Sequence, residues 1–188
     1  MLSLSLLCAL AFVLSFIKTG HHVHAYPSLL HRHDHLPLHS MARRGTVEQI
    51  DAFLDSHNFV RAQHNATALQ WSTDLAQKAE SWADQCQFRH TNGVLSGELY
   101  GENIAAGTGD FPITAAVATF VQDQNDYNPA HPNYLHFTQV VWKSTTELGC
   151  AVSQCPGIFD KSLGLASLYV CLYNPVGNVI GQAPGLIF

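Results

Sequence analysis

The sequence predicts an α+β domain, because segments with helical periodicity come first and segments with strand character follow. Apolar residues recur at steps of three and four between Val47 and Val60, which indicates a helix with one buried face. Residues 149–153 and 168–173 are short, rich in β-formers and separated by connectors that contain Gly, Pro or Asn. This order favours helices packed against a sheet.

The first helix has a defined start. Thr46-Val47-Glu48-Gln49 has the form of a capping box, with Thr at the N-cap and Gln three residues later. His57 and Arg61 lie one turn apart on or beside the apolar stripe of the same helix. We interpret His57 as a structural hydrogen-bonding residue rather than a catalytic group, since buried polar side chains need partners.

The remaining elements follow from the same signals. A second helix is expected to begin at Ser72-Thr73-Asp74, with an inner face of Leu75, Ala76, Ala79, Trp82, Ala83 and Cys86. A third helix is expected to start near Asp110 or Phe111, to continue to Gln124 and to end before Asn128-Pro129. The run His136–Trp142 has a strand-like mixture of polar and apolar residues, which predicts a strand at 137–142, ahead of those at 149–153 and 168–173.

The N-terminal part has a different character. Residues 1–25 contain a short apolar run followed by a small-x-small cleavage pattern, which predicts a signal peptide cut near Ala25. Residues 26–44 form a leader that ends in the dibasic pair Arg43-Arg44, where we expect a protease to release a domain of residues 45–188. The leader is expected to be disordered or, alternatively, to bind metal through His31, His33, His35 and His39.

The charge of residues 45–188 excludes some partners. Five basic residues oppose thirteen acidic ones, which gives a formal charge of −8. Such a surface argues against nucleic acid and against polybasic docking to anionic lipid. A second long apolar run and a hydrophobic tail are both missing from the sequence, so no membrane anchor is expected.

The cysteines favour an oxidising compartment. Beyond the signal peptide the chain keeps Cys86, Cys150, Cys155 and Cys171, an even number that indicates a disulfide framework with three possible pairings. A metal knuckle is less favoured, because no C-x-x-C spacing is present. Asn65-Ala66-Thr67 is an acceptor sequence for N-glycosylation at Asn65.

Four motifs in this order carry a family resemblance. They are His57-Asn58-Phe59-Val60-Arg61, Gly101-Glu102-Asn103-Ile104, His136-Phe137-Thr138-Gln139-Val140-Val141-Trp142, and the run from Tyr169 to Asn178. Over residues 47–182 the chain resembles the CAP superfamily (cysteine-rich secretory proteins, antigen 5 and pathogenesis-related 1 proteins), and within it the fungal pathogenesis-related 1 type. The resemblance implies an α-β-α sandwich with a central antiparallel sheet flanked by helices, and the disulfides Cys86–Cys150 and Cys155–Cys171.

The resemblance also implies a cleft lined by two histidines and two acids. The matching residues are His90, Glu102 and His136, with Asp123 at the position where the family usually has a longer Glu. Such a set suits zinc or another divalent cation, although no cofactor is required by the sequence. The alternative is a polar network in which the histidines bind the acids and join the helices to the sheet.

Lipid binding is the function that the resemblance favours, with a sterol or a fatty acid as ligand. Two places suit an apolar ligand: a groove between helices, and the loop that leads into His136. Their candidate residues are Phe53, Leu54, Phe120, Val121, Tyr127, Tyr134 and Leu135. The helical residues are alternatively ordinary core, and the short loop leaves the identity of the lipid open.

The leading hypothesis is therefore a secreted, monomeric, non-enzymatic protein that binds lipid for export or host interaction. One alternative is a ligand-free extracellular module that engages a host or cell-wall protein or acts against microbes. A second alternative is a hydrolase that uses the His and acid residues of the cleft. No nucleophile elbow, metalloprotease helix or Cys-His signature accompanies those residues, so an enzyme is not expected.

Overall fold

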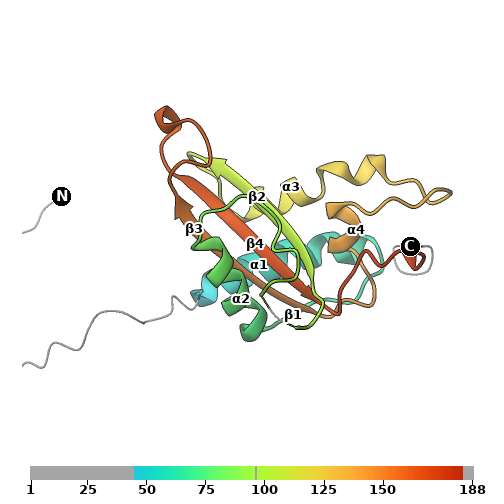
Figure 1. Ribbon diagram of the computed structural model, residues 1–188. Coiled ribbons are helices and arrows are strands. Elements are labelled where there is room, and N and C mark those ends of the chain that lie inside the picture. Colours follow the sequence, from blue (N-terminus) through green and yellow to red (C-terminus); the bar gives the residue numbers. More distant parts are fainter. Residues whose placement is uncertain (1–44, 96, 184–188) are drawn as a thin grey trace, which may run out of the picture. The chain divides into compact units, whose positions relative to one another are not determined.

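The computed structural model describes residues 45–95 and 97–183 (Figure 1). The expected signal peptide with its cleavage at Ala25, the His-rich leader and the dibasic pair Arg43-Arg44 lie outside the described residues.

A four-stranded sheet forms the middle of the domain. Its strands are β1 (Gln70–Trp71), β2 (Gly101–Thr108), β3 (Glu147–Cys155) and β4 (Ala166–Asn174), arranged in the order β1-β3-β4-β2. Strands β3 and β2 both pair antiparallel with β4, and short β1 pairs parallel with β3. The strands predicted at 149–153 and 168–173 are confirmed as parts of β3 and β4.

Helices cover both faces of this sheet. Helices α1 (Val47–Gln63), α3 (Ile113–Phe120) and α4 (His136–Val140) contribute to one apolar cluster, and α2 (Thr73–Ala83) contributes to the other. Figure 1 shows α1 and α2 on opposite sides of the sheet.

Strand β4 has a side chain in one of these clusters at each of six successive positions. Alternate residues point to opposite faces: Tyr169, Cys171 and Tyr173 to the side of α1, and Leu168, Val170 and Leu172 to the side of α2. The expected α-β-α sandwich is confirmed.

The predicted helix starts are confirmed by their caps. The Thr46 hydroxyl accepts the Gln49 amide N–H at 3.2 Å, and the Gln49 side-chain oxygen accepts the Thr46 N–H at 3.0 Å. Ser72 caps α2 through the Leu75 N–H. The third helix is shorter than predicted: α3 ends at Phe120, and a 3₁₀ helix, η1 (Gln122–Asp126), follows it.

The strand predicted at 137–142 is wrong, because this segment forms helix α4 instead. The Asp123 carboxylate accepts the backbone N–H groups of His136 and Phe137, both at 3.0 Å. The Thr138 hydroxyl accepts the N–H of Leu135 at 2.8 Å. These acceptors pair amides that a helix start otherwise leaves open, and a carboxylate there is also favoured by the helix dipole. The mixture of polar and apolar residues does not mark two faces of a strand here, because residues 137–140 are all buried.

The disulfide pairing implied by the resemblance, Cys86–Cys150 and Cys155–Cys171, is corrected by the structure. Cys150 lies directly opposite Cys171 in the β3–β4 register, and their Cα atoms are 4.1 Å apart. Both side chains point to the face covered by α1, whereas Cys155 and Cys86 belong to the cluster on the α2 face. The bonds are therefore Cys150–Cys171 and Cys86–Cys155.

A buried arginine joins α1 to the segment between α4 and β3. The Arg61 guanidinium group donates to the carbonyl oxygens of Thr67, Val140, Trp142 and Thr145, at 2.8–2.9 Å. Burial lowers the pKa of Arg61 to about 10, so the side chain stays cationic at neutral pH. Four carbonyl groups, three of them in buried hydrogen bonds, are thereby paired by one side chain.

Peptide mapping under non-reducing conditions tests the pairing. We expect crosslinked peptides that join Cys86 to Cys155 and Cys150 to Cys171, and a reduced sample provides the control. In the chain-entropy model these bonds, which close loops of 69 and 21 residues, stabilise the fold by about 4 and about 3 kcal/mol. Recovery of a Cys86–Cys150 peptide from native protein would contradict the structure.

Replacement of the buried guanidinium group tests its contribution to stability. Arg61→Lys keeps the charge but has a single nitrogen that cannot reach all four carbonyls. We expect the free energy of unfolding to fall by about 3 kcal/mol. Exposed Lys161→Arg is the control and should change it by less than about 0.5 kcal/mol. Urea denaturation measures both, and equal stabilities of the two variants would refute the role given to Arg61.

Candidate functional site

The first His–acid pair joins the loop after α2 to the start of β2. The Nδ1 atom of His90 lies 2.6 Å from Oε1 of Glu102, whose side chain is nearly buried. Both oxygens of the same carboxylate accept the backbone N–H of Thr91, each at 3.1 Å. The hydrogen bond that His90 donates to the Glu102 carboxylate raises the pKa of His90, because it favours the protonated imidazole.

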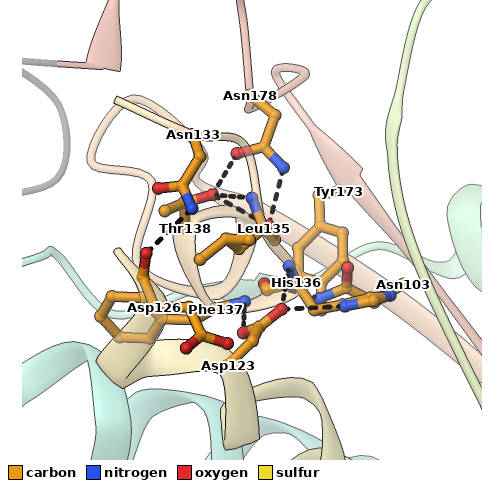
Figure 2. A network of polar contacts seen from close by, with 10 residues as sticks. All are labelled: Asn103, Asp123, Asp126, Asn133, Leu135, His136, Phe137, Thr138, Tyr173 and Asn178. Atoms are coloured by element: carbon orange, nitrogen blue, oxygen red, sulfur yellow. Dashed lines mark hydrogen bonds and ion pairs between the residues drawn. The ribbon is translucent and has the colours of Figure 1, made fainter. Parts of the chain in front are cut away.

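The second pair lies at the N-terminus of α4 (Figure 2). The Nδ1 atom of His136 is 3.0 Å from Oδ2 of Asp123, an oxygen that also accepts the His136 backbone N–H. Asp123 comes from η1, so the 3₁₀ helix positions the carboxylate for both the helix start and the imidazole. Both carboxylate oxygens of Asp123, the shorter residue at this position, thus accept N–H groups at the start of α4.

A buried hydrogen-bonded chain links the second pair to α1. Asn103 Nδ2 donates to the His136 carbonyl at 3.1 Å and lies 3.2 Å from the Tyr173 hydroxyl (Figure 2). That hydroxyl lies 2.9 Å from Nε2 of His57, whose Nδ1 is 2.8 Å from the Phe53 carbonyl oxygen. Since a carbonyl can only accept, Nδ1 of His57 carries the proton and Nε2 accepts from the tyrosine. His57 therefore has a structural role.

A shallow pocket of about 280 Å³ lies beside the first pair. Its lining is mainly polar and consists of His90, Thr91, Asn92, Gly93, Tyr100, Gly101, Glu102, Gln139, Val176, Gly177 and Asn178. Buried Gln139 accepts the Gly177 N–H at 3.1 Å, and a side chain at Gly101 or Gly177 would collide with it. Gln139, Gly177 and Asn178 were not predicted as site residues, although they belong to the motifs that carry the resemblance.

The four predicted cleft residues thus form two His–acid pairs, and the pocket of about 280 Å³ is lined by one of these pairs. His136 and Asp123 are not among the lining residues of the pocket that holds His90 and Glu102. Within 45–95 and 97–183, no three or more His, Cys, Asp or Glu side chains are grouped to hold a metal ion. Each Nδ1 already faces an acid, which leaves Nε2 as the nitrogen for any further ligand. The donor set of either pair alone does not make a complete zinc shell, and metal binding stays a prediction.

The helical residues predicted for lipid binding meet at the contact between α1 and α3. Phe53 and Phe120 are almost fully buried in the core cluster. Leu54 and Val121 are half-buried and pack against the same cluster. The structure therefore brings these four residues together at one helix–helix contact, and their contact with lipid stays a prediction.

The loop that leads into His136 lies against the core, and its contact with lipid stays a prediction. Tyr127 and Tyr134 are half-buried and pack against the core cluster of α1 and α3. The Tyr134 hydroxyl accepts the N–H of Gly181 at 2.6 Å, which ties the loop to the C-terminal segment. Leu135 is the N-cap residue of α4. Asn65, the predicted glycosylation site, is exposed in the turn after α1 with φ of 53°, and its modification stays a prediction.

The pH dependence of stability tests the buried chain. Burial lowers the pKa of His57 to about 4, whereas the unfolded chain has an ordinary pKa near 6.5. Between these values the unfolded state binds the proton and the folded state does not, so stability falls as the pH falls from about 6.5 to about 4. The loss contributed by His57 is up to about 3 kcal/mol.

The variant His57→Gln isolates this contribution, because it keeps a donor and an acceptor but cannot titrate. We expect a weaker fall in unfolding free energy over this pH range than in the wild type, measured by urea denaturation at a series of pH values. Identical pH slopes in the two proteins would show that His57 is not held neutral by burial.

Comparison with known proteins places the chain in a family. The model of the cysteine-rich secretory protein family, CAP, matches residues 54–173. Fruiting body protein SC14 of Schizophyllum commune is 40% identical over 144 residues, which cover 71% of this chain and 64% of SC14. Secreted protein PRY1 of Candida albicans is 41% identical over 139 residues, which cover 72% of this chain but only 31% of PRY1.

Solved structures show the same fold. The crystal structure of NaASP2 with Zn²⁺ has a TM-score of 0.59 at 22% identity and covers 73% of this chain and 85% of NaASP2. Among the described helices, none has the length and apolar character needed to cross a membrane. The family match, the identities to the fungal proteins and the α-β-α architecture agree. The chain belongs to the cysteine-rich secretory protein (CAP) family.

Proposed function

We propose that this protein is a secreted, non-enzymatic binder of a small apolar lipid, a fatty acid or a sterol. The observation that carries the proposal is the apolar contact between α1 and α3, here called the α1–α3 seam. Helix α1 contributes Phe53 and Leu54 to it. Helix α3 contributes Val117 and Phe120, and its C-cap residue Val121 also belongs to it. The family resemblance supports lipid as the class of ligand.

Helix α3 has the composition of a helix that contacts apolar material on more than one side. Its eight residues, Ile-Thr-Ala-Ala-Val-Ala-Thr-Phe, include no charged side chain. Ala116, Val117 and Phe120 face the core, whereas Ile113 is only half-buried, and the exposed positions Thr114 and Ala118 are small. Surface helices normally carry a charged or polar outer face, so this composition favours an apolar partner for α3.

The seam has a graded burial that suits an elongated ligand. Phe53 and Phe120 are almost fully buried, whereas Leu54 and Val121 are half-buried and are here called the margin of the seam. An acyl chain or a sterol edge placed along this margin would remove further apolar surface from water, at about 25 cal/mol per Å². No charged group of α3 would have to be desolvated, since the helix has none.

Secretion is supported by two independent features. Two disulfides in one small domain are typical of proteins that fold in an oxidising compartment. PRY1 and RBT4 of Candida albicans, 41% and 40% identical to this chain, are both named secreted proteins. The signal peptide expected from residues 1–25 agrees with this proposal.

A binding role is favoured over hydrolysis by the surroundings of the pair His90 and Glu102. The pocket beside His90 and Glu102 is lined by no serine or cysteine within the described residues. The Thr91 hydroxyl in this pocket is 2.9 Å from the Tyr100 hydroxyl. The four cysteines of the described domain are all held in disulfides. A nucleophile mechanism requires an activated hydroxyl or thiol next to its base.

Uptake of lipid by delipidated protein tests the proposal. We expect saturable binding of a fluorescent fatty acid or a fluorescent sterol, and about tenfold weaker binding by Leu54→Ser/Val121→Ser, which removes apolar contact at the margin of the seam. Phe59→Ser is the matched control, because Phe59 lies on the same helix with 71% of its surface exposed.

The outcomes separate the candidate functions. Wild-type protein that takes up neither lipid would refute the proposal and would favour the protein-interaction alternative. An equal loss in the Phe59→Ser control would show that the α1–α3 seam is not the site. Hydrolysis of a protein substrate that is abolished by His136→Ala would instead support the hydrolase alternative.

A further inference from the structure

The connection between β3 and β4 exposes apolar side chains at one end of the sheet. This segment, residues 156–165, is here called the β3–β4 loop, and Figure 1 shows it projecting past the ends of both strands. Phe159, Leu163 and Leu165 are 38%, 56% and 54% exposed. Exposure of three large apolar side chains to water on a ten-residue loop is unfavourable, which indicates that they bind a partner.

The backbone of the loop is supported by its own contacts. Asp160 Oδ1 accepts the Ser162 backbone N–H at 2.8 Å and its hydroxyl at 2.7 Å, which caps the short helix η2 (Lys161–Leu163). Ile158 is half-buried and packs against the core on the α2 side. The Cys86–Cys155 disulfide fixes the residue that precedes the loop. The exposed apolar side chains are therefore presented by an ordered scaffold, and little conformational entropy is lost when they bind.

The charges on and around the loop select the kind of partner. The loop has one acid, Asp160, and one base, Lys161, so its net charge is zero. Residues 45–188 as a whole carry a formal charge of −8, which repels anionic lipid. An apolar tip without net charge on an acidic protein fits an electrically neutral surface with an apolar interior, such as a zwitterionic phospholipid bilayer.

The sheet register places the loop at the same end of the domain as the start of α3. Ala166, the first residue of β4, pairs with Cys155 on one side and with Thr108 on the other. Only four residues, 109–112, separate Thr108 from Ile113 at the start of α3. A chain of that length spans at most about 18 Å between these residues. The beginning of the α1–α3 seam and the β3–β4 loop thus share one end of the sheet.

We propose that the β3–β4 loop docks this protein on zwitterionic phospholipid bilayers, with Phe159, Leu163 and Leu165 inserted at the interface. The docking itself depends only on the loop. Its purpose rests on the proposed function, because a domain docked by this end has the start of its α1–α3 seam near the bilayer from which lipid is taken.

Flotation of the secreted protein with phosphatidylcholine vesicles tests the docking. We expect wild-type protein to float with the vesicles and to remain bound when the salt concentration is raised. Phe159→Ser/Leu163→Ser/Leu165→Ser should lower the partition coefficient by about tenfold for each side chain removed. Phe59→Ser, an exposed phenylalanine on α1, is the matched control and should bind vesicles as the wild type does. Urea denaturation verifies that both variants fold.

Three results would overturn the docking proposal. These are wild-type protein that does not float, an equal loss in the Phe59→Ser control, and a wild-type dimer that the triple substitution dissociates, which would make the loop an interface between two copies. Uptake of fluorescent fatty acid without vesicles is measured in parallel. A triple variant that takes up fatty acid but does not float supports docking, and wild-type protein that floats without taking up lipid supports docking while refuting the proposed function.

Discussion

The architecture depends on a buried cation that is paired only with carbonyl oxygens. Arg61 extends from α1 and fixes the carbonyls of Val140, Trp142 and Thr145 on the path from α4 to β3. An arginine in the interior is stable only when its donors are paired, so this path can have little freedom. The position of α4, and with it that of His136, follows from this constraint.

In each His–acid pair, one carboxylate contacts both an imidazole and a backbone N–H group. Glu102 binds the Thr91 amide and His90, and Asp123 binds the start of α4 and His136. Both carboxylates thus belong to polar contacts of the fold, and metal binding by the two histidines stays a prediction. The apolar ligand is instead proposed for the contact between α1 and α3, because α3 has no charged side chain.

Local signals in the sequence were sufficient for the elements that local forces define. The capping box before α1, the serine cap of α2 and the β-rich runs of β3 and β4 were all predicted. Strand β2 was not, because Gly- and Ala-containing Gly101–Thr108 has weak β-propensity and is stabilised by its pairing with β4. Helix α4 was mistaken for a strand, since Asp123, which caps it, lies thirteen residues before His136. The disulfides required the register that sets Cys150 opposite Cys171.

Native mass spectrometry of protein secreted from a eukaryotic host tests whether the protein binds an apolar lipid. We expect a folded protein with two disulfides that carries near-stoichiometric sterol or fatty acid, released by organic extraction. Protein that is empty as secreted, and that stays empty after incubation with either lipid, would refute lipid binding.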